Sequence, residues 1–180
     1  RRFPAAGRFV SVDVEAHPEK GDRIFAIGAV RSDDAGAFSS GCSPAKAPAV
    51  AASLNSFARG GRVLLGHNIR RHDVPLLRDQ LPQLECLSWP VLDTLELSAL
   101  AFPSNPYHRL VKGYKLLTDE RNNPTKDARV ALNVLEESVE ALLETNEQER
   151  WWLALLHFLF REDEGMATLL SQVREETAPT

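Results

Sequence analysis

Strand patterns alternate with helix patterns along this chain, and that alternation constrains the fold more than any other feature. Residues 8–14 and 23–30 are apolar, rich in β-branched side chains and separated by turn residues, which predicts two neighbouring strands. Shorter strands are predicted at 62–65 and 89–92, with a further short one at 37–39. Strands interleaved with helices predict an α/β protein with a mixed sheet.

Apolar residues at helical spacing occupy the stretches between and after these strands. They predict helices at 49–59 and 69–81, and residues 93–96 have the form of a capping box that begins another helix. An N-cap asparagine followed by proline begins a long helix at 124–143. Two further apolar stripes after residue 147 predict two C-terminal helices.

The organisation of the chain follows from these elements. We predict a domain at residues 1–146 and a helical extension at 147–180 that leads toward a further domain. The sequence begins without Met and both ends read like linker, so we expect a piece of a larger protein.

Composition excludes several classes of protein. The chain has 180 residues, of which 43% are hydrophobic and 26% charged, which suits one globular domain with a real core. No apolar run reaches the ~18 residues of a membrane span. Two cysteines without a CxxC pair, and no signal-peptide pattern, indicate a reducing, cytoplasmic compartment. A net charge of -4 argues against a protein that binds nucleic acid over its whole surface, but it is compatible with a local basic patch.

Four carboxylates fall on faces that should otherwise be apolar. Asp13 and Glu15 are two residues apart on the first strand and therefore point to the same side of the sheet. Asp73 and Asp127 each lie four residues before an apolar residue on the inward stripe of a predicted helix. The sequence thus predicts acids from three different elements on buried faces.

Such a set of acids indicates a metal site. Burying one unpaired carboxylate costs several kcal/mol, and no Lys or Arg occupies the matching inward positions. Mg²⁺ or Mn²⁺ removes this cost, since both ions prefer oxygen ligands. Two-metal nucleases use acid clusters of this kind, which implies a phosphodiester substrate. Each acid alone has an ordinary explanation, such as a helix-start acid favoured by the macrodipole; their joint occurrence favours the metal site.

The motifs resemble those of the DEDD exonuclease superfamily, the DnaQ-like and RNase T-like enzymes with a ribonuclease H-like fold. Residues 9–15 resemble the first exonuclease motif, an apolar strand that ends in DxE. Residues 64–73 resemble the second, a GHN turn followed by an acid, and 91–94 resemble the strand and DT that come next. Residues 122–128 resemble the third. The resemblance implies a central mixed five-stranded sheet flanked by helices, here with extra C-terminal helices.

The resemblance also implies an activity and a site. The expected reaction is metal-dependent 3′–5′ exonuclease cleavage of single-stranded nucleic acid ends, with DNA favoured over RNA and two Mg²⁺ or Mn²⁺ ions. Asp13, Glu15 and Asp127 would hold one ion with the scissile phosphate. Asp13 would bridge to the second ion, and Asp73 would complete the cluster directly or through water.

Other residues of the motifs are expected to shape the turn and contact the substrate. Gly66 and His67 would form a structural turn that positions Asn68 and the following helix. Phosphate and substrate contacts are expected from residues on the flanks of the site: Asn68, Arg70, Arg109, Lys112 and Asn122.

The general base departs from the family pattern. The family has a His five residues before the last Asp, or a Tyr four before it, and this chain has Asn122 and Asn123 there. An amide cannot accept the proton, and general-base help is typically worth about 10²–10⁴ in rate. The candidate substitutes are His108, His72 or a metal-bound hydroxide alone.

Alternative functions stay open at this point. Residues 107–112 with 122–124 most resemble exonuclease-type domains attached to bacterial RecQ-like helicases, so a helicase partner is expected and a membrane is not. Asn122 also suggests a weak or inactive domain that binds nucleic acid ends or a partner protein. An unrelated phosphatase or nucleotidyl-transfer fold is the third alternative. The intact acid set favours catalysis, because a decayed enzyme does not need four carboxylates on buried faces.

Overall fold

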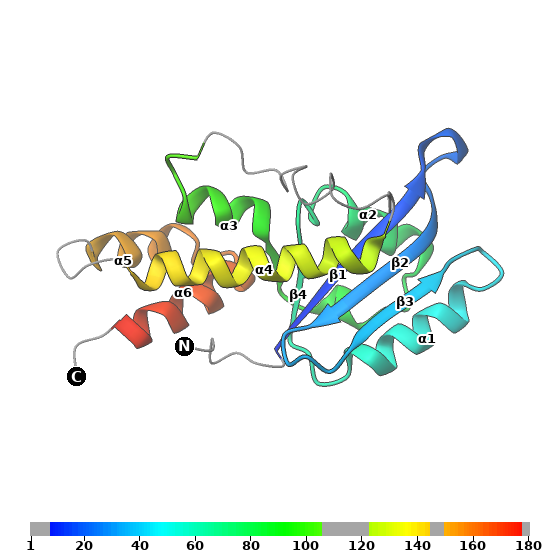
Figure 1. Ribbon diagram of the computed structural model, residues 1–180, viewed down its shortest axis with the longest axis horizontal. Coiled ribbons are helices and arrows are strands. Elements are labelled where there is room, and N and C mark those ends of the chain that lie inside the picture. Colours follow the sequence, from blue (N-terminus) through cyan, green and yellow to red (C-terminus); the bar gives the residue numbers. More distant parts are fainter. Residues whose placement is uncertain (1–7, 106–122, 145–149, 178–180) are drawn as a thin grey trace.

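The computed structural model describes residues 8–105, 123–144 and 150–177. Its five strands form one open sheet of order β3-β2-β1-β4-β5 (Figure 1). β1 pairs antiparallel with β2 and parallel with β4, while β2–β3 is antiparallel and β4–β5 is parallel. The sheet is therefore mixed and five-stranded, and the predicted α/β class is confirmed. The strands are β1 (Phe9–His17), β2 (Arg23–Arg31), β3 (Ala37–Gly41), β4 (Val63–Gly66) and β5 (Val91–Asp93).

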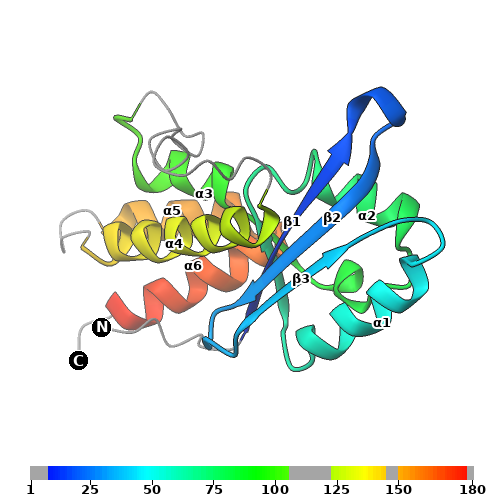
Figure 2. The same cartoon turned by 45° about the vertical axis from the view of Figure 1, so that its right-hand side comes forward.

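Six α-helices lie among the described residues, and they cover both faces of the sheet. They are α1 (Ala47–Ala58), α2 (Asp73–Gln80), α3 (Thr94–Ala101), α4 (Pro124–Leu143), α5 (Arg150–Leu159) and α6 (Glu164–Thr177). Two short 3-10 helices, Pro18–Lys20 and Glu85–Ser88, lie in connecting segments. α4 crosses one face of β1 and β2, and α1 and α2 pack on the other side (Figure 2).

The alternation along β1 produces the two cores. Its even-numbered valines, Val10, Val12 and Val14, are at most 3% exposed and pack with α1 and α2. Phe9 points to the opposite face and packs with α4 and the C-terminal helices. Because side chains alternate along a strand, Asp13 and Glu15 share the face of Phe9. The acids therefore lie on the side of the sheet that α4 covers.

The helix predicted at 69–81 begins later than expected. The structure places residues 69–72 in a turn, and α2 begins only at Asp73. Asn68 has a left-handed backbone with φ +60, which directs the chain into this turn rather than into a helix. The two carboxylate oxygens of Asp93 accept the backbone N–H groups of Asn68 and Arg70, at 2.8 and 3.2 Å. Side-chain hydrogen bonds to the backbone compete with helix formation in this way.

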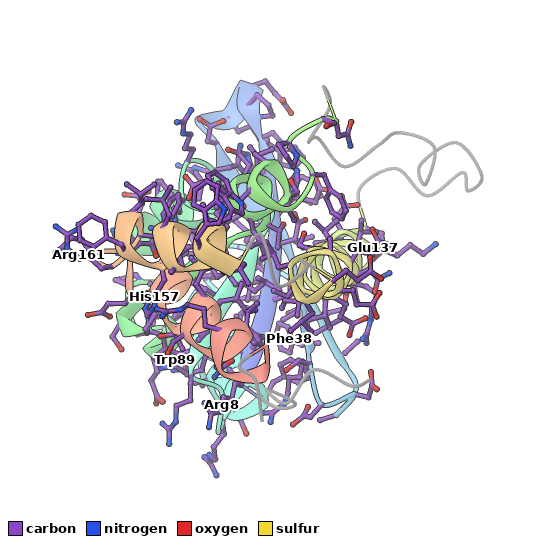
Figure 3. The ribbon with its side chains drawn as sticks, turned by 90° about the vertical axis from the view of Figure 1, so that its left-hand side faces the viewer. Arg8, Phe38, Trp89, Glu137, His157 and Arg161 are labelled. Carbon is purple, nitrogen blue, oxygen red and sulfur yellow. The ribbon has the colours of Figure 1, made fainter. Side chains whose placement is uncertain are left out.

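The C-terminal helices belong to the same hydrophobic core as α4. Met166, Leu169, Leu170 and Val173 of α6 are fully buried in the cluster that also contains Phe9. A hydrogen bond of 2.8 Å from the Arg174 guanidinium to His157 Nδ1 joins α6 to α5, and Figure 3 views this end of the molecule. The described part of the extension predicted at 147–180 thus shares its core with the domain predicted at 1–146.

Gly165 shows how closely α6 approaches the sheet. A Cβ atom at this position would lie 2.3 Å from the carbonyl oxygen of Val91 in β5, so only glycine fits without displacement. Within the described ranges, no helix combines the length and the apolar character needed to cross a membrane.

Candidate metal centre

Three carboxylates meet where α4 crosses β1. One oxygen each from Asp13, Glu15 and Asp127 lies within 4.8 Å of the other two, and all three residues are half-buried. They come from two elements that are more than a hundred residues apart along the chain. The structure thus brings together three of the four acids that the sequence predicts for the site.

A glycine in β2 allows this approach. Gly28 lies opposite Asp13 in the antiparallel β1–β2 pair. A Cβ atom on Gly28 would lie 2.1 Å from the backbone nitrogen of Thr125 and 2.3 Å from the carbonyl carbon of Pro124. The missing side chain lets the first turn of α4 rest on the sheet, which places Asp127 beside the two acids of β1.

The start of α4 is fixed by local capping. The side chain of Asn123 accepts the backbone N–H of Lys126 at 3.2 Å, and Pro124 occupies the first turn, where its missing N–H costs nothing. The hydroxyl of Thr125 donates to the carbonyl of Phe38 in β3 at 3.2 Å. These contacts anchor the helix end that carries Asp127.

Asp73 lies beside this group but has another partner. Its Oδ1 accepts the backbone N–H of Val14, the residue between Asp13 and Glu15, at 2.9 Å, and Asp73 is 2% exposed. β4 pairs with β1 only as far as Ser11, so Asp73 satisfies a strand N–H beyond the last paired residue. The fourth predicted acid therefore supports the strand that carries two of the others.

His72 lies at the edge of the site. Its Nδ1 is 3.7 Å from Oδ1 of Asp73, and 55% of its side chain is exposed. Hydrogen bonding to Asp73 raises the pKa of His72 above its usual value, against the opposing effect of burial, and the charges of Asp73, Asp22 and Glu15 raise it further. The structure thus places an imidazole next to the acids, on the turn that precedes α2.

The GHN turn is held by residues at the end of β5. The hydroxyl of Thr94 donates to the carbonyl of Gly66 at 3.2 Å, and it lies 3.0 Å from Nδ1 of His67. Asp93, which is 2% exposed, holds the backbone of Asn68. In the sequence, Asp93 belongs to a capping box and to the DT of residues 91–94, and neither pattern indicates a bond to this turn. Its second role depends on two strands lying side by side, which no local pattern reveals.

Arg70, from which a phosphate contact is predicted, has several partners within the protein. One guanidinium nitrogen donates to Oδ2 of Asp163 at 2.6 Å and to the carbonyl of Val91 at 2.5 Å. Its Nε lies 3.6 Å from Glu96. The guanidinium therefore ties the turn before α2 to β5, α3 and the start of α6. Four other predicted residues, His108, Arg109, Lys112 and Asn122, lie outside the described residues.

The donor set fits a hard divalent cation. Two oxygens bound to one Mg²⁺ at about 2.0–2.1 Å lie at most about 4.2 Å apart, and the larger Ca²⁺ allows about 5 Å. The spacing of up to 4.8 Å among the three carboxylates is close to this range. Small side-chain rotations would therefore suffice for Asp13, Glu15 and Asp127 to hold one ion. Oδ1 of Asp73, the candidate ligand for a second ion, already accepts a hydrogen bond from the N–H of Val14.

No protein-family model matches this chain, and no curated protein is significantly similar to it.

Proposed function

We propose that this protein is a metal-dependent nuclease that hydrolyses phosphodiester bonds at the 3′ ends of single-stranded nucleic acid. The observation that carries the proposal is the meeting of Asp13, Glu15 and Asp127 within 4.8 Å. The direction of cleavage and the preference for DNA rest on the resemblance of the three motifs to DEDD exonucleases. A ribonuclease H-like fold is part of the same proposal, and the mixed five-stranded sheet supports it.

The protein's own residues would act by holding and orienting. Asp13 and Glu15 project from a strand whose backbone Asp73 fixes, and Asp127 projects from a helix end anchored by capping and by Thr125. A bound Mg²⁺ or Mn²⁺ would neutralise charge on the phosphodiester and activate water. His72 lies half-exposed beside Asp73. It would accept the proton of the attacking water, the task of the His or Tyr that the family has and this chain lacks.

The direct test is degradation of single-stranded DNA and the matching RNA, labelled at the 3′ or the 5′ end, with Mg²⁺ or Mn²⁺. We expect stepwise shortening from the 3′ end by the wild type and a loss of at least about 10²-fold in Asp13→Ala. The matched control is Glu162→Gln, since 87% of the Glu162 side chain is exposed and it lies in the turn before α6. This control should cleave like the wild type.

Calorimetric titration with Mn²⁺ separates metal binding from catalysis. If the wild type binds Mn²⁺, and both Mn²⁺ binding and cleavage disappear in Asp13→Ala, the nuclease is supported. The same titration gives the number of ions bound. Binding without cleavage of either strand would reject the nuclease and leave a nucleic-acid-binding module, the alternative that Asn122 suggests. Cleavage that survives in Asp13→Ala would reject the site.

A further inference from the structure

The β1–β2 hairpin carries a stacked pair of aromatic rings beyond the acids. The rings of His17 and Phe25 have centroids 4.2 Å apart and planes inclined by 25°. Both residues are half-buried, and 37% of the His17 side chain is exposed. This hairpin extends beyond the neighbouring strands at the upper right of Figure 1.

The ring pair lies on the same face of the sheet as the acids. Asp13, Glu15 and His17 are odd-numbered residues of one strand and therefore project to one side. The register of the strand pair shifts between Glu15 and Ala16, which forms a β-bulge in which Phe25 is the extra residue of β2. At this bulge the ring of Phe25 stacks on that of His17. Two residues of a strand span roughly 6.8 Å. The rings thus begin about one nucleotide's length beyond Glu15.

Resting on the function proposed above, we propose that the His17–Phe25 pair is a stacking platform for an unpaired nucleobase of the bound strand. When a phosphodiester lies at the three acids, the neighbouring base falls within reach of the rings. Aromatic side chains stack on any of the four bases, because every base has a π-face. The platform therefore selects unpaired bases without selecting sequence.

Two exposed cations lie near the rings, on a hairpin tip that also exposes Glu19 and Asp22. Arg23 lies directly opposite His17 in the strand pair and is exposed, so its guanidinium can contact a phosphate beside the stacked base. Lys20, at the tip of the hairpin, is also exposed. Glu19 lies 3.3 Å from Nδ1 of His17 and orients that ring.

The hairpin is held in position before any ligand arrives. Gln80 of α2 accepts the backbone N–H of Ile24 at 2.9 Å, and its amide donates to the carbonyl of Asp22 at 3.0 Å. The carbonyl of Phe25 accepts the N–H of Cys42, beyond β3, at 2.8 Å. A platform fixed in this way loses little conformational entropy when it binds.

The test is binding of a short fluorescent oligothymidylate, measured by anisotropy with Ca²⁺ in place of Mg²⁺ or Mn²⁺, so that a cation can occupy the three acids while cleavage is suppressed. Phe25→Leu keeps an apolar side chain but removes the ring, and a lost base stack weakens binding by roughly 10-fold or more. Phe25→Trp should bind like the wild type. The matched control is Phe158→Leu, because Phe158 is an aromatic of α5 that is 61% exposed and lies in another part of the molecule.

Three outcomes would overturn the platform: wild-type affinity in Phe25→Leu, an equal loss in Phe158→Leu, or a loss in Phe25→Trp as large as in Phe25→Leu. His17→Ala provides a second variant if Phe25→Leu unfolds, and thermal unfolding of each variant shows that it is folded. We expect His17→Ala to weaken binding in the same way, and unchanged affinity would also overturn the platform.

The cleavage assay distinguishes a failure of this inference from a failure of the proposed function. If the wild type cleaves DNA while Phe25→Leu binds normally, the nuclease stands and the platform fails. If the wild type binds through Phe25 and cleaves neither strand, the platform stands and the nuclease fails.

Discussion

Asp73 is a buried carboxylate whose hydrogen-bond partner is a backbone N–H 59 residues earlier in the chain. We predict that Asp73→Ala lowers the free energy of unfolding by about 1–3 kcal/mol, because it leaves the N–H of Val14 without an acceptor in the interior. Asp73→Asn keeps an oxygen acceptor and should lose less. Urea unfolding followed by circular dichroism measures both.

The control for this prediction lies on the same helix. Asp79 is exposed near the end of α2, so Asp79→Ala should leave the unfolding midpoint nearly unchanged. An equal effect of Asp73→Ala and Asp79→Ala would contradict the structural role given to the Val14 contact.

Single residues differ in how far the sequence reveals their roles. The two-residue spacing of Asp13 and Glu15 predicts one shared face, because strand periodicity is a local property. The spacing of Asp73 predicts only an inward direction. Its bond to Val14, and the ion pair of Arg70 with Asp163, depend on which distant segments become neighbours.

At the scale of elements, the contact between Gly28 and α4 decides where the helix lies. Gly28→Ala would drive a Cβ into the backbone at Thr125, which cannot rotate away as a side chain could. We predict that the variant loses about 1–3 kcal/mol of stability and that Mn²⁺ binding at the three acids weakens, since Asp127 moves with the helix. Thermal unfolding and calorimetric Mn²⁺ titration test the two effects.

Gly41 in β3 offers the matched substitution. A Cβ there would meet only the carbonyl oxygen of Phe25, at an ordinary 3.8 Å, so Gly41→Ala should fold and bind Mn²⁺ like the wild type. Unaltered Mn²⁺ affinity in Gly28→Ala would show that α4 does not set the position of the third acid.

The elements themselves are largely predictable, whereas some of their boundaries are not. The long helix at 124–143 is confirmed to the residue, because its asparagine cap, its proline and its apolar stripe all lie in the local sequence. The helix predicted at 69–81 is wrong by four residues at its start, and its end comes one residue early. The side chain that holds residues 68–70 as a turn comes from Asp93, on another strand.

At the scale of the whole molecule, the described C-terminal helices and α4 form one core. Leu170 of α6 is fully buried in it. We predict that Leu170→Ala costs about 2–5 kcal/mol and that unfolding stays a single transition, the same by tryptophan fluorescence and by circular dichroism. Leu159→Ala is the control, because Leu159 is 58% exposed on α5.

Two separate unfolding transitions would contradict this prediction. They would instead support the division near residue 146 that the sequence predicts. That division follows from a polar stretch between helices, and such a stretch is compatible with either a linker or a loop. Whether the later helices dock on the sheet depends on shape, for instance on the space that Gly165 leaves beside Val91. Local composition does not encode that fit.

The ion pair between Arg70 and Asp163 constrains which substitutions these two positions can accept during evolution. Its members are 93 residues apart, and Arg70 also donates to the Val91 carbonyl inside the fold. Losing Asp163 alone leaves a partly buried cation with a poorer set of partners, so a change at one position favours a compensating change at the other. In related sequences the two positions should therefore covary, although neither adjoins the other in the chain.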